Sequence, residues 1–137
     1  MIIAGLLGFS MATADPMLAF TAKGASGGYA KVHICNSFGK EIRTIEGNFV
    51  GDCKSVRWVS TERLVWFAES AEGKKAEVWT ATLSSLKPVR VAFGTHLTFP
   101  SQAVPGPFNF TTQEGGPMAP IRFASVDSNG KLTEPQQ

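Results

Sequence analysis

The feature that most constrains this chain is a pattern that recurs three times, at intervals of 43 to 47 residues. Each unit has an apolar stretch, a polar or glycine-bearing loop, and a second stretch of apolar and β-branched residues. The first stretches are 18–21, 65–68 and 108–111, and the second are 32–36, 78–82 and 121–124. Aligning the units places Phe20, Phe67 and Phe110 at one position and Val32, Val78 and Ile121 at another. A period of this length indicates a fold built by stacking one supersecondary unit.

The turns of the units also correspond. Asn36 and Asp127 each precede a glycine by three residues, Gly39 and Gly130. An Asn or Asp side chain opens a turn by accepting backbone hydrogen bonds, and glycine supplies the positive φ that closes it. The second unit has 83–87 at this place and lacks the glycine, so its turn departs from the repeat.

The remaining segments also favour strands. Short β-branched and aromatic runs with period-two alternation lie between turn residues, and 55–59 is a clear case. The best helix candidate, 60–72, contains the continuous apolar run 64–67, which suits a buried strand. Further strands are expected at 41–45, 54–60, 88–92, 97–104 and 132–133.

Four strands per period match the size of a propeller blade. The sequence therefore predicts an all-β fold, with two to three four-stranded antiparallel blades of an open, incomplete β-propeller. The domain is expected at 15–137, with blades at about 17–53, 54–96 and 97–133 by this period. Bulky aromatic residues at period two usually fill a core, so six of them should pack between blades. These are Phe20, Trp58, Trp66, Phe67, Trp79 and Phe110.

The stretches 18–20, 36–39, 56–58 and 65–67 resemble the WD-like blades of TolB-type propellers and of the N-terminal propeller of prolyl-oligopeptidase-family peptidases. The resemblance spans about 17–133 and implies a propeller that binds peptides or filters substrates. The Ser-Pro-Asp-Gly turn of such blades is 60–63 here, without Pro or Gly. Three blades do not close a ring, because known propellers use about four to eight. We therefore expect a piece of a longer protein, with self-association through the open blade faces as the alternative.

The first residues point to export. The stretch 2–9 is apolar, and the small residues 12–14 follow it, as in a secretory signal peptide. No basic residue precedes the apolar run, and a buried first strand is the alternative explanation. We expect 1–14 to be signal-peptide-like and the protein to be secreted or periplasmic. The run is too short for a membrane span.

The charge distribution and the small number of metal-ligating residues argue against a nucleic-acid-binding protein and a metalloprotein. The chain has 13 basic and 11 acidic residues without a basic cluster, so no nucleic-acid partner is expected. His33 and His96 with two cysteines make too small a set for zinc, and neither a metal nor a cofactor is predicted. Cys35 is expected late in a strand and Cys53 in a loop at the opposite end of the blade. Whether the two form a disulfide is left open by the sequence.

The stretch 24–28, Gly-Ala-Ser-Gly-Gly, fits the nucleophile elbow of serine hydrolases, with Ser26 as nucleophile. That chemistry needs a strand before the serine and a helix after it, followed by an acid and a histidine. The residues after Ser26 have a strand pattern instead, and the only histidine in the right order is His96. A glycine-rich hairpin accounts for the same residues, so no catalytic residue is predicted.

These observations predict a non-catalytic binding or gating module for a protein or peptide, with no enzymatic activity of its own. The loops 23–30, 70–77 and 112–119 join equivalent strands and should lie on one side of the stack. Loops on a rigid scaffold often carry binding. The alternative function is a truncated serine hydrolase that uses Ser26.

Overall fold

The computed structural model describes residues 17–73, 75–94, 97–98, 106–113 and 118–134, and these form strands and turns only. The signal-peptide-like stretch 1–14 lies outside the described residues, as does His96. No helix in the described part of the chain has the length and apolar character needed to cross a bilayer.

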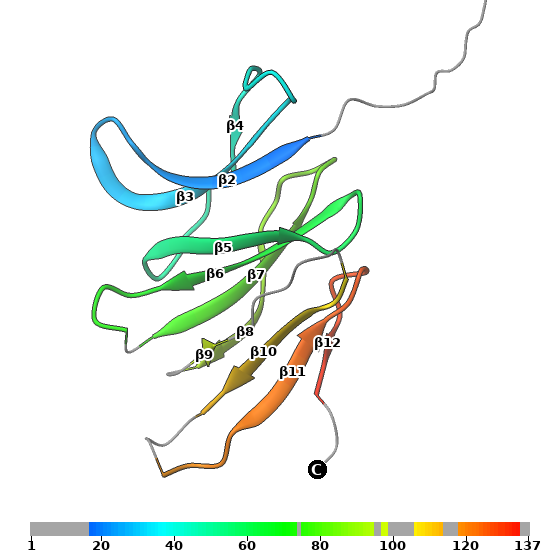
Figure 1. Ribbon diagram of the computed structural model, residues 1–137. Coiled ribbons are helices and arrows are strands. Elements are labelled where there is room, and N and C mark those ends of the chain that lie inside the picture. Colours follow the sequence, from blue (N-terminus) through cyan, green and yellow to red (C-terminus); the bar gives the residue numbers. More distant parts are fainter. Residues whose placement is uncertain (1–16, 74, 95–96, 99–105, 114–117, 135–137) are drawn as a thin grey trace, which may run out of the picture.

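Three antiparallel sheets follow one another along the chain and stack face to face (Figure 1). The first contains β2 (Leu18–Gly24), β3 (Gly27–Cys35) and β4 (Arg43–Thr44). The second contains β5 (Asp52–Trp58), β6 (Arg63–Glu69), β7 (Ala76–Thr82) and β8 (Val89–Gly94). The third contains β9 (Leu97–Thr98), β10 (Phe108–Thr112), β11 (Arg122–Val126) and β12 (Leu132–Thr133). In each sheet, strands that follow one another in the chain are also paired side by side.

The second sheet is buried on both faces, and its central strand β6 shows why. Leu64, Trp66 and Ala68 face the first sheet, whereas Val65 and Phe67 face the third. Successive side chains of a strand point to opposite faces, so a strand covered on both sides must be apolar at every position. This explains the continuous apolar run at 64–68 that the sequence shows.

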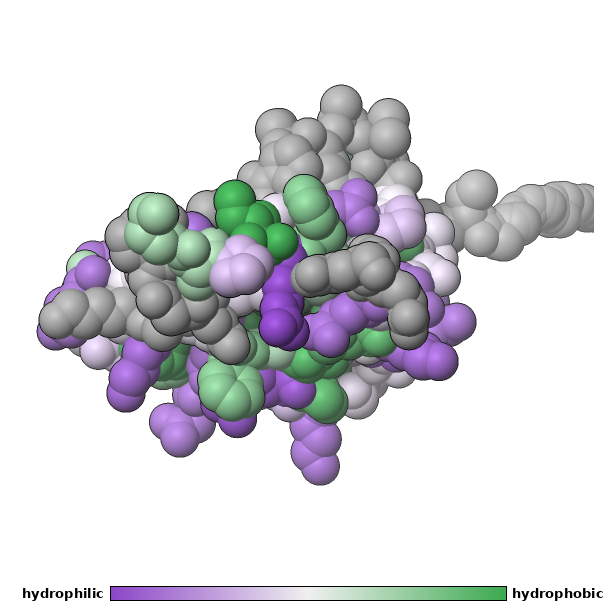
Figure 2. All heavy atoms as spheres, turned by 90° about the horizontal axis from the view of Figure 1, so that it is seen from below, coloured by the Kyte–Doolittle hydropathy of each residue, from purple (hydrophilic) through white to green (hydrophobic). Residues whose placement is uncertain are grey.

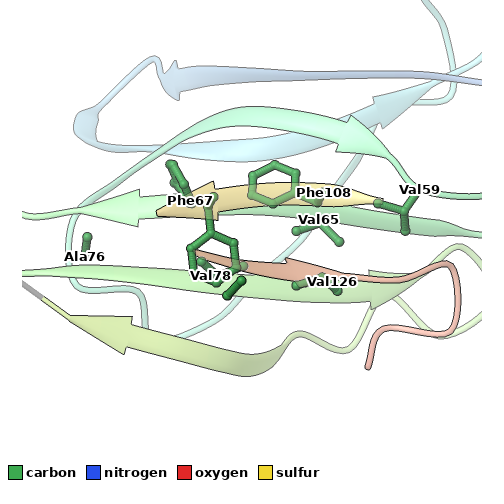
Figure 3. Packing of buried hydrophobic residues seen from close by; sticks show 9 residues of the cluster. Val59, Val65, Phe67, Ala76, Val78, Phe108 and Val126 are labelled. Carbon is green, nitrogen blue, oxygen red and sulfur yellow. The ribbon is translucent and has the colours of Figure 1, made fainter. Parts of the chain in front are cut away.

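Between the second and third sheets, Phe67 is the central residue of the core. Its ring makes edge contacts with Phe108 at 5.3 Å and with Phe110 at 6.2 Å between centroids. Val59, Val65, Val78 and Val126 surround these rings (Figure 3). The corresponding core between the first two sheets contains Val32, Ile34, Ile45, Cys53, Leu64, Trp66, Ala68 and Ala81.

The predicted turns form as the sequence indicates. The Asn36 side-chain oxygen accepts hydrogen bonds from the backbone N–H groups of Phe38 and Lys40, at 3.0 and 2.9 Å. Asp127 accepts the equivalent bonds from Asn129 and Lys131, both at 2.9 Å. Gly39 and Gly130 take positive φ angles of 73° and 79°. In the second sheet Leu86 takes the positive φ, which is the departure expected from the missing glycine.

The predicted equivalence of the three phenylalanines is wrong. Phe67 points toward the third sheet, Phe110 points back toward the second, and Phe20 lies on the outer face of the first sheet. Phe20 is 36% exposed, and it is therefore not part of the core between sheets as predicted. A shift of one residue in the alignment turns a strand side chain to the other face, and the repeat in the sequence does not fix that shift.

Two expectations for β5 also need correction. Cys53 lies within this strand and not in a loop. The regular alternation expected for 55–59 is broken by a bulge between Lys54 and Arg57, where Ser55 has a positive φ of 60°. Because a bulge adds one residue, Cys53 and Trp58 contact the same core although their numbers differ in parity.

Candidate binding surfaces

The hairpin ends of all three sheets lie on one side of the stack, at the left of Figure 1. The described connections there are 25–26 between β2 and β3, 70–75 without Lys74 between β6 and β7, and the two ends of the β10–β11 loop, 113 and 118–121. We call this the hairpin side. Tyr29 is exposed beside the first hairpin, and Met118 of the third is 95% exposed. Exposed aromatic and thioether side chains at the hairpin ends of a scaffold of sheets suit a contact surface.

The middle hairpin is held by its own hydrogen bonds. The Ser70 hydroxyl accepts a bond from the backbone N–H of Lys75 at 3.1 Å, and the backbone N–H of Gly73 donates to the Ser70 carbonyl at 2.9 Å. Gly73 has a φ of 69°. The Ser70 side chain thus accepts a backbone hydrogen bond that closes the turn, as the Asn36 and Asp127 side chains do in the turns at the other end of the sheets.

Ser26 lies in the two-residue turn of the first hairpin and is exposed. Strand β3 begins at Gly27, directly after it, where a nucleophile elbow requires a helix. Gly27 and Gly28 have φ angles of 87° and 83°, values that favour glycine, so the hairpin itself accounts for them. The histidine invoked with Ser26, His96, lies outside the described residues.

His33 is engaged on the outer face of the first sheet. Its Nδ1 lies 2.9 Å from the Thr44 hydroxyl, its Nε2 lies 3.1 Å from the Ala22 carbonyl oxygen, and its ring stacks on Phe20 at 5.2 Å. A carbonyl oxygen can only accept, so Nε2 carries the proton of this bond. Among the described residues, no three His, Cys, Asp or Glu side chains come together as a set of metal ligands.

Cys35 and Cys53 are both buried and both free thiols. Burial raises the pKa of Cys53 from 9.0 to about 12, although the neighbouring Trp66 side chain counteracts part of the effect. A thiol that stays protonated at neutral pH is a poor nucleophile, so Cys53 acts as a small apolar core residue.

Glu77 is a buried carboxylate that the sequence did not predict. Its Oε1 accepts hydrogen bonds from the Val50 backbone N–H at 3.0 Å and from the Trp79 indole at 2.9 Å. Its Oε2 pairs with Arg90 at 3.1 Å. Both oxygens are engaged, so this group joins the segment before β5 to the second sheet and does not face a ligand. No spacing in the sequence distinguishes it from a surface glutamate.

At each end of the stack, one sheet face has no other described sheet packed against it. On the first sheet, the outer face carries Leu18, Phe20 and His33, and we call it the first open face. On the third sheet, Ala124 and Val126 point into the core, so Phe123 points outward; it is 65% exposed, and Ile121 beside it is also exposed. We call this the third open face. Figure 2 looks at this end from below, where apolar side chains lie among hydrophilic ones.

The described surface includes two hollows whose lining residues are defined. One of 530 Å³ lies at the end of the first sheet, between Met17, Asn36, Ile42 and Arg43, and includes Glu41. The other, of 360 Å³, lies where the outer strand of the second sheet meets the third, and its lining includes Arg90, Phe93, Leu132 and Glu134. The Arg90 guanidinium sits 4.6 Å from the centre of the Phe93 ring. Neither hollow brings together an acid, a base and a nucleophile, as a catalytic site would require.

A comparison with known proteins supports a propeller-like fold. The chain is similar to a solved structure of oligogalacturonate lyase in complex with manganese, at a TM-score of 0.52 and 15% sequence identity. The match covers 88% of this chain and 33% of the lyase, so the chain spans about a third of that protein's length. No protein-family model matches the chain, and no curated protein matches it.

These findings define the class. The chain is an all-β protein with the architecture of an incomplete β-propeller, built from successive antiparallel sheets of three and four strands. At this level of identity the similarity shows the fold alone, because one propeller architecture hosts many unrelated activities.

Proposed function

We propose that this chain is a non-catalytic segment of a β-propeller that binds protein or peptide ligands, or gates their access, through its hairpin side. The observation that carries the proposal is the placement of three successive hairpins on one side of a rigid stack. Tyr29 supplies an exposed ring there that contacts a ligand at a small cost in conformational entropy, and Met118 supplies an exposed thioether side chain that adapts to the shape of a partner.

The proposal includes the parentage and location expected from the sequence. The WD-like pattern of 18–20, 36–39, 56–58 and 65–67 supports a propeller of the kind that precedes a prolyl-oligopeptidase-like catalytic domain. The apolar stretch 2–9, followed by small residues, supports export to the periplasm or the medium. In such a protein this segment would select substrates, and another domain would do the chemistry.

Selection from a library of displayed random peptides tests the binding role. Peptides recovered on the wild-type chain should bind the double variant Tyr29→Ser/Met118→Ser at least ten-fold more weakly. They should bind Phe38→Ser with unchanged affinity. Phe38 is 78% exposed, but it lies in the turn after β3, at the far end of that strand from Tyr29. Equal binding to all three proteins would exclude the hairpin side as the site.

A fluorophosphonate probe tests the non-catalytic part of the proposal. We expect no labelling of the folded wild-type chain above that of a heat-denatured sample. Labelling of the wild type that disappears in Ser26→Ala would instead establish a serine hydrolase and refute the proposal.

A further inference from the structure

One edge of the first sheet lacks a strand that the other two sheets have. The strands β6 and β10 are each paired on both sides, β6 with β5 and β7 and β10 with β9 and β11. The strand β2 begins the corresponding hairpin of the first sheet, and among the described residues it pairs with β3 alone. The place that β5 and β9 hold in their sheets is therefore open beside β2.

The burial of β2 reflects this open place. In β6, Leu64, Trp66 and Ala68 are fully buried. In β2, each of the seven residues is exposed or only partly buried. This holds even for Ala19 and Thr21, which lie opposite the buried Ile34 and Val32 of β3 and so face the second sheet with them. A neighbouring sheet alone thus does not bury β2, and a strand along its edge is the missing cover.

The free edge of β2 is regular enough to accept a strand. Alternate residues of an edge strand point their N–H and C=O groups away from the sheet, where they are unpaired. The pairing of β2 with β3 is uninterrupted from Leu18 to Ala22, and its register shifts only beyond Ala22. Other outer strands have features that limit further pairing, because β4 and β12 contain two residues each and β8 is bulged at Val91.

We infer that an extended segment of a partner polypeptide adds to this edge and pairs antiparallel with residues 18–22. The occupant is a strand because both other sheets fill the equivalent place with one, and β5 and β9 run antiparallel to their neighbours. In this mode the main chain supplies the hydrogen bonds and the side chains supply the specificity.

The exposed side chains of β2 define the chemistry of the partner. Leu18 and Phe20 lie on one face of β2 and are 49% and 36% exposed. The partner residues that alternate onto this face would be their cross-strand neighbours, so they should be apolar or β-branched. The inference concerns a surface other than the hairpin side and does not rest on the ligand proposed for that side.

A synthetic peptide provides the probe, with the sequence Lys-Val-Thr-Val-Thr-Val-Lys and a fluorescent label. Its binding to the full chain is followed by fluorescence anisotropy. A second peptide has the same side chains but carries an N-methyl group on every valine and threonine, which removes the N–H donors of both its edges. The second peptide should bind at least about ten-fold more weakly, because strand addition depends on main-chain hydrogen bonds. Equal binding of the two peptides would overturn the inference.

Hydrogen exchange locates the site. In the free chain, the amides of residues 18–22 that point to the open edge should exchange rapidly, and the probe should slow them. Probe binding without protection of 18–22 would overturn the inference. Slow exchange of all these amides in the free chain would also overturn it, because the edge would then already be occupied, by residues 1–16 or by a second copy.

Two serine variants test the side-chain contacts of the probe. Phe20→Ser removes a cross-strand neighbour and should weaken probe binding about two- to five-fold. Phe38→Ser is the matched control, since Phe38 is 78% exposed in the turn after β3, and it should bind the probe like the wild type. An equal loss in both variants would overturn the inference.

The double variant Tyr29→Ser/Met118→Ser separates this site from the hairpin side. It should bind the probe with unchanged affinity, and loss of binding would place the probe on the hairpin side and overturn the inference. Failure of the library experiment on the hairpin side would leave these results unaffected, so the two proposals fail independently.

Discussion

Replacing Phe67 by alanine tests the stacking of the second and third sheets most directly. Phe67 is 5% exposed, and its ring contacts Phe108 and Phe110 edge to face. Truncating a buried phenylalanine to alanine typically costs about 3–5 kcal/mol of folding free energy. Each aromatic edge contact adds about 0.5–1.5 kcal/mol beyond the area buried. We expect Phe67→Ala to cost about 4 kcal/mol, a large part of the roughly 5–15 kcal/mol available to a small domain.

The conservative variant Phe67→Leu separates the ring contacts from the volume. Leucine keeps most of the apolar bulk, so its cost should fall to about 1–2 kcal/mol. In a double-mutant cycle with Phe108→Leu, the coupling energy should be about 0.5–1.5 kcal/mol because the two rings touch. Phe123→Ala is the surface control, and it should change stability by less than about 0.5 kcal/mol.

Urea unfolding provides the assay, with free energies from linear extrapolation. The three tryptophans, Trp58, Trp66 and Trp79, all pack in the core between the first and second sheets, so their fluorescence reports that interface. Far-ultraviolet circular dichroism reports all three sheets. Measurements at low protein concentration keep self-association from adding to the apparent stability.

The two probes also show whether the sheets unfold together. In the wild type we expect coincident transitions, because the second sheet contributes to both cores. In Phe67→Ala the dichroism transition should begin at lower urea than the fluorescence transition, since only the second interface is weakened. The reasoning fails if Phe67→Ala is as stable as Phe123→Ala.

Three further predictions concern single residues. A Cβ added at Gly51 would lie 2.1 Å from the Glu69 carbonyl oxygen, so Gly51→Ala should lower the thermal midpoint by at least about 5 °C. Gly106→Ala, where a Cβ meets nothing within 4 Å, should leave the midpoint nearly unchanged. Glu77→Ala should cost about 2–4 kcal/mol in urea unfolding, because it leaves the partly buried Trp79 and Val50 donors without this acceptor; a cost below 1 kcal/mol would contradict the role given to this carboxylate. Cys53 should resist alkylation at pH 8 until the chain unfolds, as mass spectrometry can show. Because its folded pKa of about 12 lies above the ordinary 9.0, unfolding is favoured increasingly as pH rises from 9 toward 12. Rapid alkylation of the native protein would refute this.

Much of the candidate surface could be placed from the sequence because hairpins are local. A strand, a turn residue with a side-chain acceptor and a glycine suffice to locate the connections at Asn36 and Asp127, which lie at the end of the sheets opposite the hairpin side, and both formed as predicted. Because successive antiparallel strands reverse direction, the equivalent hairpins of the three units then lie together at the other end, which is the hairpin side. The exposed apolar residues of the open faces could not be found this way, since exposure depends on which sheet covers which.

Recurring β-sheets could be predicted from the sequence alone, because strand period, turn chemistry and repeat spacing all depend on residues that are close together in the chain. The direction in which each aromatic ring points depends on contacts between sheets, so it could be learned only from the folded chain. Phe20, Phe67 and Phe110 occupy similar places in the repeat, yet a difference of one residue in register sends Phe67 forward and Phe110 back and leaves Phe20 exposed. The same holds for Glu77 and Cys53, whose burial depends on a neighbouring sheet formed by a distant part of the chain.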